Sequence, residues 1–318
     1  EGNDASKLDT ATADFQMKEA GLVDFKGSER EILTQIRKLV SILPANNEDD
    51  MSYEVCGDDL NRLCADIAGG AGDTSIALSM ISDNNFFLEV KAEYARSMVT
   101  GFIRLNGATV GCVANRTEVY DAEKGESESL KAGLTAQGCT KAAEFVSFCD
   151  AFNIPIVTLV DVPGFLPGTT QEYGGVITHG AKLLFAYCEA TVPKITVTLR
   201  KAYGGAYIVM SSKHIRGDIN YAWPTAEIAV MGASGAVGVL HAKEVAAIEN
   251  PEERAKFVAE KEQEYNDKFS NPYNAARYGY IDDVIEPRNT RFRIIRALQA
   301  LSTKRLQNPP KKHSNIPL

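Results

Sequence analysis

A turn rich in small residues near the middle of the chain is the strongest candidate for chemistry. It follows an apolar run over residues 194–199 and consists of Tyr203, Gly204, Gly205 and Ala206. Glycine lets a backbone approach a ligand closely, and the first amides of a following helix have no acceptor within that helix. Two such amides can stabilise an oxyanion, so Gly205 and Ala206 are the predicted catalytic residues. The alternative is that the glycines only allow tight packing of a strand on a helix.

Patterns typical of other mechanisms are missing from the sequence. It holds no GxxxxGK[ST], HExxH or GxSxG motif, and the glycine-containing turn at residues 232–235 lacks the acidic partner of a dinucleotide fingerprint. None of the four histidines stands in a nucleophile setting, so each is expected to be structural or exposed: His179, His214, His241 and His313. We therefore expect backbone amides to stabilise an enolate-like oxygen while the substrate or a cofactor supplies the base.

The elements around this turn alternate between strands and helices. Buried strands, each followed by a glycine-containing turn, are predicted at residues 154–160, 194–199 and 228–231. Helices are predicted at residues 140–152, 175–191, 207–213, 243–268 and 289–304. The repeated unit is thus a buried strand, a turn and a helix, which indicates an α/β fold.

The first third of the chain is less regular. A strand is predicted at 21–25 and a helix at 29–43 that stops at Pro44. Strands are predicted at 86–90, 95–105 and 109–114, and an Asn106-Gly107 turn joins the last two into a hairpin. A surface loop is predicted at 118–137. The acidic, Asn-rich stretch at 46–50 is interpreted as a linker. We therefore expect a boundary here, with residues 1–50 as an N-terminal remnant or linker and 51–318 as the main domain.

Composition excludes several classes of function. The chain has 318 residues, 44% of them hydrophobic, and a formal net charge of −8, so no general field attracts nucleic acid. The apolar runs are too short to span a membrane, and no signal peptide opens the sequence. Six scattered cysteines without CxxC pairs indicate free thiols in a reducing cytoplasm and no metal site.

Longer motifs resemble biotin-dependent acyl-CoA carboxyltransferases, specifically the C-terminal domain of propionyl-CoA carboxylase β subunits, transcarboxylase large subunits and methylmalonyl-CoA decarboxylase α subunits. The resemblance covers nearly the whole chain and is carried by VDVPGFLPG at 160–168, QEYGG at 171–175, RKAYGGAY at 200–207 and YAWPTAEIAVMG at 221–232. It implies a crotonase-like fold of ββα units and transfer of CO2 between carboxybiotin and the α-carbon of a short-chain acyl-CoA, such as acetyl- or propionyl-CoA.

The resemblance also implies two oxyanion holes that face each other across a subunit interface. One, on an N-terminal domain, polarises the acyl-CoA thioester. The other, at Gly205 and Ala206, stabilises the ureido oxygen of biotin, whose freed nitrogen then removes the α-proton. The implied biotin contacts are Val162, Pro163, Gly164, Phe165, Tyr203 and Gly204, and the implied substrate contacts are Ile208 and Asn115.

The implied partners are a carboxyltransferase N-terminal-half subunit, a biotin carboxyl carrier or biotin carboxylase subunit, and further copies of the chain. The sequence departs from the family at residues 122–130, an acidic insertion, and at residues 133–139. One alternative function is the carboxyltransferase of an acyl-CoA decarboxylase coupled to a sodium pump, and another is a non-catalytic scaffold or inhibitor of a full-length homologue. A neighbouring biotin carboxylase gene would favour the carboxylase, and a multi-span membrane subunit the decarboxylase.

Overall fold

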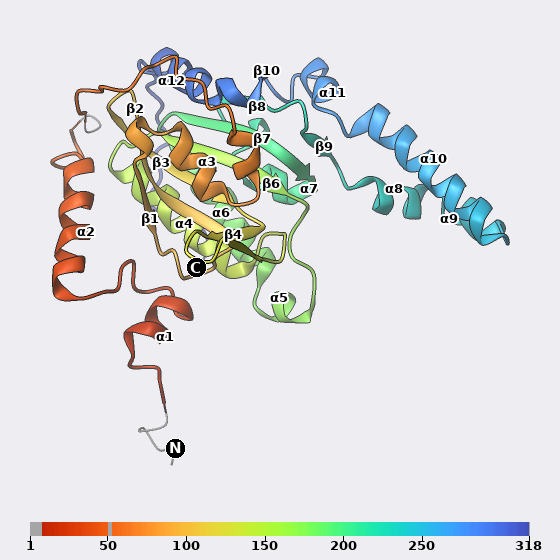
Figure 1. Ribbon diagram of the computed structural model, residues 1–318, viewed down its shortest axis with the longest axis horizontal. Helices are drawn as coiled ribbons and strands as arrows, with labels where there is room; N and C mark the ends of the chain where they lie inside the picture. Colours follow the sequence, from red (N-terminus) through yellow and green to blue (C-terminus); the bar gives the residue numbers. More distant parts are fainter. Residues whose placement is uncertain (1–7, 50–52, 318) are drawn as a thin grey trace.

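One mixed sheet runs through the computed structural model, which describes residues 8–49 and 53–317, and separates two layers of helices (Figure 1). The strand order is β1-β2-β3-β6-β7-β8-β10, and β9 pairs with β7. The strands are β1 (Phe87–Val90), β2 (Met98–Leu105), β3 (Ala108–Asn115), β6 (Ile156–Val162), β7 (Lys194–Tyr203), β8 (Ile219–Ala222), β9 (Glu227–Ala229) and β10 (Asp283–Val284). Pairing is antiparallel from β1 to β3 and parallel from β3 onward. The predicted α/β class is therefore confirmed.

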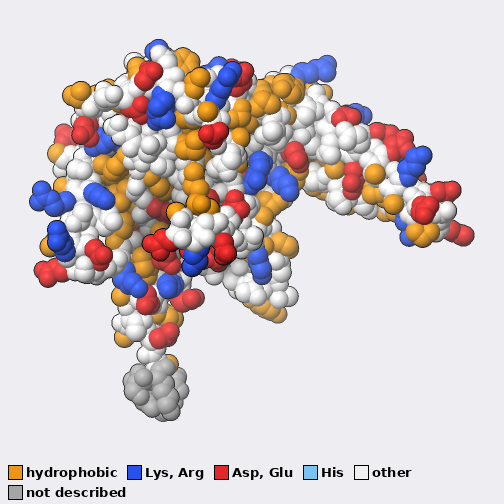
Figure 2. All heavy atoms as spheres, in the orientation of Figure 1, with side chains coloured by type: hydrophobic (Ala, Val, Ile, Leu, Met, Phe, Trp, Pro, Cys, Tyr) orange, Lys and Arg blue, Asp and Glu red, His pale blue; other side chains and the backbone are white. Residues whose placement is uncertain are grey.

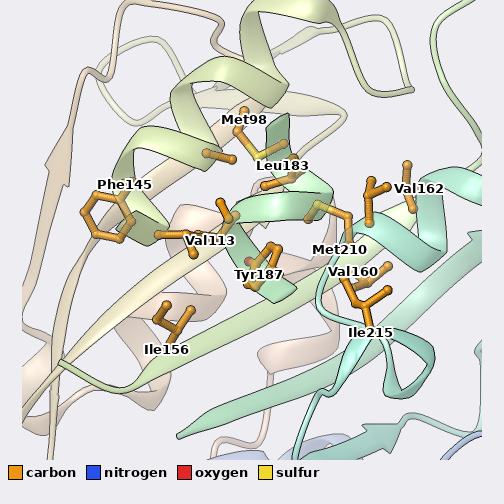
Figure 3. Close-up of a cluster of buried hydrophobic side chains, with 14 of the residues drawn as sticks. Met98, Val113, Phe145, Ile156, Val160, Val162, Leu183, Tyr187, Met210 and Ile215 are labelled. Atoms are coloured by element: carbon orange, nitrogen blue, oxygen red, sulfur yellow. The ribbon is translucent and has the colours of Figure 1, made fainter. Parts of the chain in front are cut away.

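Each face of the sheet has its own hydrophobic core. Helices α4 (Ala136–Ala151) and α6 (Val176–Glu189) cover one face, and α3 (Thr74–Ile81) and α12 (Thr290–Ala300) cover the other. Figure 3 shows Val113 and Val160 of the sheet and Leu183 of α6 among the side chains of the first core. Because Val157 of β6 belongs to the second core while Val160 belongs to the first, β6 is buried on both sides, which explains its continuous β-branched sequence.

The hairpin predicted near residue 106 is confirmed. Asn106 and Gly107 both have positive φ, 52° and 81°, which is the backbone of a two-residue type I′ turn between β2 and β3. Strand β2 begins at Met98 and not at Ala95, because Ala95 has a left-handed φ of 43° that interrupts an extended backbone.

Two predictions for the first half of the chain are wrong. Residues 21–25 form no strand, since the segment folds back on α1 (Ala13–Lys18), with the Leu22 amide donating to the Gln16 carbonyl at 2.9 Å. Residues 118–137 are not a plain loop, because they hold the hairpin of β4 (Glu118–Asp121) and β5 (Glu126–Ser129) and the start of α4. The predicted helix near residue 30 is confirmed as α2 (Glu29–Ile42), which Ser28 and Glu31 cap.

Later elements also differ from the expectation. The run at 228–231 is not a buried strand, because β9 has only three residues and Val230 is exposed, while the strand beside β7 in the sheet is β8. The helix predicted at 243–268 is interrupted, giving α9 (Ala242–Ala247) and α10 (Pro251–Phe269), because Asn250 caps a new helix whose first residue is Pro251. Helices α8 (Ala233–Leu240), α9 and α10 form an arm that projects from the body in Figure 1.

The C-terminal tail lies along the end of α6. The Glu189 carboxylate accepts hydrogen bonds from Lys311 Nζ at 2.6 Å and Ser314 Oγ at 2.7 Å, and the Glu189 carbonyl accepts one from Asn308 Nδ2 at 2.7 Å. Ile316 packs against the core beneath α4 and α6. The tail is therefore fixed to the helical layer by both polar and apolar contacts.

Figure 2 shows acidic and basic side chains interspersed on the face it presents. Within the described ranges, no helix combines the length and apolar character needed to cross a membrane. The predicted domain boundary between residues 50 and 51 lies outside the described residues, so it stays a prediction.

Candidate functional site

The candidate site lies where three neighbouring strands end. Strands β3, β6 and β7 are parallel, so their carboxyl ends meet at one edge of the sheet. The turn at 162–165 follows β6, and the turn at 203–206 joins β7 to the short helix α7 (Gly204–Val209). Ligands of open α/β sheets bind at this edge, which places both predicted turns where a site is expected.

Phe165 brings the two turns together. A Cβ atom built on Gly205 would lie 3.7 Å from Cε2 of the Phe165 ring, which is van der Waals distance. The segment before α4 holds this turn from the other side, because the Leu134 amide donates to the Gly164 carbonyl at 3.0 Å and the Leu166 amide donates to the Leu134 carbonyl at 2.8 Å. An aromatic ring thus borders the first turn of α7.

The start of α7 has the backbone that an oxyanion hole needs. Gly204 has a φ of +57°, and a Cβ atom there would lie 2.8 Å from the Val230 carbonyl oxygen, so only glycine fits without strain. The amides of Gly205 and Ala206 belong to the first turn, which has no intrahelical acceptors, and Tyr203 provides no side-chain cap. Gly205 is exposed while the Ala206 side chain is buried, so a ligand can approach the turn from solvent at Gly205.

Tyr203 and Ile208 lie on either side of this turn. The buried Tyr203 hydroxyl donates to the Glu227 carboxylate of β9, and burial together with that bond raises the pKa of the Tyr203 phenol well above its ordinary value. Tyr203 therefore stays neutral and fixes the end of β7 to β9. Ile208 is half-buried and packs against the core beneath α4 and α6.

Asn115 is the last residue of β3, and its side chain is occupied by backbone. Its Oδ1 accepts the Asp161 amide at 2.9 Å and its Nδ2 donates to the Asp161 carbonyl. The side chain is buried at the sheet edge between β3 and β6. The substrate contact implied for Asn115 stays a prediction.

Sequence reasoning missed Asp161, which precedes the turn at 162–165. Its buried carboxylate accepts the Lys201 amide at 3.0 Å and Arg200 Nε at 2.8 Å. A signal was present in the sequence, because an aspartate inside a run of apolar residues needs buried donors. The carboxylate therefore joins β6 to the end of β7.

His179 precedes Gly180 on α6, and Gly180 is the residue that lies against the Phe165 ring. Thr140 Oγ1 lies 2.8 Å from His179 Nδ1, and burial lowers the pKa of the imidazole, with the nearby Lys182 charge acting in the same direction. The neutral form is therefore favoured. Among the residues that the structure describes, no group of three or more His, Cys, Asp or Glu side chains is arranged as a metal site.

Two cavities lie elsewhere in the protein. One of about 160 Å³ lies between α4, β2 and residues 24–25, and one of about 840 Å³ lies beside Pro193 and Ile295, where the strands begin. Neither is lined by residues of the two turns. The candidate site lies apart from both cavities, with Gly205 exposed.

Comparison with known proteins gives a consistent result. Residues 2–316 match the family described as carboxyl transferase domain. The chain is 52% identical over 295 residues to the propionyl-CoA carboxylase beta chain of Cereibacter sphaeroides, covering 91% of this chain and 54% of that protein. It is 46% identical over 323 residues to the methylmalonyl-CoA carboxyltransferase 12S subunit of Propionibacterium freudenreichii subsp. shermanii, covering 99% and 59%.

A decarboxylase subunit and, separately, a crystal structure are also similar to this chain. The methylmalonyl-CoA decarboxylase subunit alpha of Propionigenium modestum is 45% identical over 297 residues, covering 91% of this chain and 55% of that protein. The transcarboxylase 12S crystal structure with hydrolysed methylmalonyl-coenzyme A bound superposes with a TM-score of 0.88 at 45% identity, covering 100% of this chain and 60% of that one. The predicted crotonase-like fold is thereby confirmed. The chain spans little more than half the length of these relatives.

Proposed function

Because the chain belongs to the carboxyl transferase domain family, we propose that it carries the biotin-facing half of an acyl-CoA carboxyltransferase active site. Its reaction is the transfer of CO2 between carboxybiotin and the α-carbon of a short-chain acyl-CoA. The observation that carries the proposal is the position of Phe165 beside the first turn of α7, which sets an apolar ring next to two amides without intrahelical acceptors.

The residues of the two turns fit a biotin ring. Biotin has an apolar bicyclic body and a ureido oxygen, and the site offers the Phe165 ring beside the Gly205 and Ala206 amides, with Gly205 exposed. Bound on a carrier protein, biotin supplies the carboxyl group and a ureido nitrogen that acts as a base. The chain's own contribution is to hold the developing oxyanion with two fixed donors, each worth about 3 to 4 kcal/mol.

The other half of the reaction needs groups from outside the two turns. The resemblance assigns the thioester oxyanion hole to an N-terminal carboxyltransferase domain, and this chain covers only 54% and 59% of two of the relatives. We therefore propose an N-terminal-half carboxyltransferase as a partner surface, a biotin carrier or biotin carboxylase subunit, and a symmetric assembly of several copies. The 12S structure is described as a hexamer assembly, which supports the last of these proposals. Location in the cytoplasm stays a prediction.

The same site serves transfer in either direction. The decarboxylase subunit alpha from Propionigenium modestum, at 45% identity, supports a decarboxylase as the second candidate. Ile208 is the residue that we expect to border the acyl group, and an apolar side chain there is compatible with acetyl, propionyl and slightly longer chains. The intact turn at 203–206 argues against a scaffold without catalysis.

Substitution of Gly205 by valine tests the proposal. Measured in the complex purified from its native source, carboxyl transfer between the biotinylated partner and propionyl-CoA is expected to fall about 100- to 1000-fold. The valine side chain would block the approach to the Gly205 amide, with a cost similar to the loss of one oxyanion donor. The fold should survive, because a Cβ atom at Gly205 meets only the Phe165 ring. The control is Gly57→Val, since Gly57 is exposed and a Cβ atom there meets no atom within 4 Å. Unchanged transfer in Gly205→Val would show that these amides are not the oxyanion hole.

A further inference from the structure

Asp161 connects the two turns of the candidate site. We propose that it is a positioning residue, which holds the turn at 162–165 and the turn at 203–206 in the relative arrangement that carboxyl transfer requires. This inference rests on the proposed function. It assigns a role to a residue that touches neither biotin nor acyl-CoA in that proposal and acts through the backbone of β7.

The carboxylate reaches from one turn to the other. Asp161 directly precedes Val162, the first residue of the first turn. Its carboxylate accepts the amide of Lys201 at 3.0 Å, three residues before Gly204. It also accepts Arg200 Nε at 2.8 Å. A charge-assisted bond of this kind is about twice as strong as a neutral one, so Asp161 fixes the distance between the two turns more firmly than sheet pairing alone.

The pairing of β6 with β7 is irregular at this point. Val160 pairs with Thr198 and Val162 pairs with Ala202, so β6 advances by two residues while β7 advances by four. The extra residues of β7 leave backbone groups without their regular partners on β6. The Asp161 carboxylate takes one of these, the Lys201 amide. It thereby determines where regular pairing resumes, at Ala202, immediately before the catalytic turn.

Asp161 is itself held on both sides. Asn115 of β3 binds the Asp161 backbone through both amide atoms, with the Asp161 amide at 2.9 Å from Oδ1. Arg200, the cation beside the carboxylate, also donates to Thr117 Oγ1 at 3.2 Å. A connected set of side chains therefore spans three adjacent strands. A substitution at Asp161 is expected to shift the backbone of β7 at Lys201 and in the turn that follows.

Asp218 provides a matched control at the other end of the same strand. Its Oδ2 accepts the amide of Lys194, the first residue of β7, at 2.8 Å, and Lys304 Nζ at 2.7 Å. Both aspartates thus hold one backbone amide of β7 and one cation. Only Asp161 lies beside the candidate site. A role limited to stability predicts similar effects for the two positions, while a positioning role does not.

The experiment compares Asp161→Asn with Asp218→Asn in the full complex with its biotinylated partner. We expect Asp161→Asn to lower kcat for carboxyl transfer about 10- to 100-fold, the usual effect of a misplaced site. KM for acyl-CoA should stay within about twofold, because that substrate is held mainly by the other half. Asp218→Asn should lower the melting temperature without a selective loss of kcat.

Equal kcat values in the two variants, with an active wild type, would overturn the positioning role and leave the proposed function standing. A wild-type complex that transfers no carboxyl group would overturn both. If Asp161→Asn does not fold, Arg200→Gln and Arg200→Lys decide the question, because they change only the cation. A kcat that falls in Arg200→Gln and is largely restored in Arg200→Lys supports the proposal, and equal wild-type rates in both overturn it.

Discussion

The side chain of Phe165 lies against the backbone of Gly180 on α6, where a Cβ atom would come within 2.8 Å of ring atom Cε1. The ring occupies the space that a side chain at Gly180 would take. Because the same ring borders Gly205, the small residue on α6 controls a position in the candidate site.

Gly180→Ala is therefore expected to displace the Phe165 ring and to slow carboxyl transfer about tenfold. Overpacking costs about 1 to 3 kcal/mol, partly offset by a gain of about 0.5 to 1 kcal/mol from replacing a helical glycine. Initial rates and urea denaturation measure the two effects. Gly238→Ala on α8, where a Cβ atom meets nothing within 4 Å, is the control. Wild-type rates in Gly180→Ala would show that the position of the ring does not matter.

Arg291 on α12 is fully buried and joins two separate parts of the chain. Its Nη2 lies 2.6 Å from Asp83 Oδ1, a charge contact outside hydrogen-bond geometry, and its Nη1 donates to the Ile81 carbonyl at 2.7 Å. Arg291→Ala leaves the buried Asp83 charge without its cation, so the free energy of unfolding should fall by about 3 to 5 kcal/mol.

Urea or thermal denaturation checks this value, with Arg288→Ala as the control. Arg288 forms an exposed ion pair with Glu286, and exposed pairs contribute at most about 1 kcal/mol. Similar losses in the two variants would contradict the importance of burial at Arg291.

Lys194 predicts a pH dependence of stability. Its ammonium donates to the carbonyls of Tyr187 at 2.6 Å and Ala190 at 2.9 Å, but burial, with a smaller effect of the Lys304 charge, lowers its pKa from 10.5 to about 8. Between these values the unfolded chain binds more protons at this residue than the folded one. Its contribution to the free energy of unfolding therefore rises with pH, by at most about 1.4 kcal/mol per unit.

Because other groups titrate in the same pH range, the contribution of Lys194 is measured as the difference between the wild type and a variant without this lysine. The free energy of unfolding of the wild type minus that of Lys194→Met should increase from pH 8 to pH 10. Well below pH 8 the lysine is protonated in both states, and the difference should be flat. Lys243→Met, at an exposed lysine of α9, gives the baseline. A difference that falls over this range would contradict the lowered pKa.

Local sequence determines part of this structure. The run that became β6 is β-branched and buried on both faces, so its composition alone predicts a central strand. The hairpin of β4 and β5 was missed because its residues are polar and largely exposed, and its stability comes from backbone pairing and contacts such as Arg96 with Glu128 at 3.0 Å. The prediction of a buried strand at 228–231 was wrong because tertiary packing, and not local sequence, decides which apolar run is covered.

The candidate site divides in the same way. The glycines at 204 and 205 identify the turn in the sequence. The positive φ of Gly204 favours glycine directly, and the absence of a side chain at Gly205 leaves open space at the turn. The contact of Asp161 with Arg200 joins residues 39 positions apart, and it depends on the register shift between β6 and β7. No local pattern specifies that register, so Asp161 was not predicted.

The tail has a consequence for the order in which the protein is made. A chain leaves the ribosome amino end first, and Lys311 and Ser314 follow Glu189 by 122 and 125 residues. At typical rates of synthesis this is a delay of roughly 6 to 25 seconds. During that interval the carbonyl end of α6 lacks Asn308, and the Glu189 carboxylate lacks its donors. Helix α6, which supports Phe165, is therefore among the last parts of the newly synthesised chain to gain its full set of contacts.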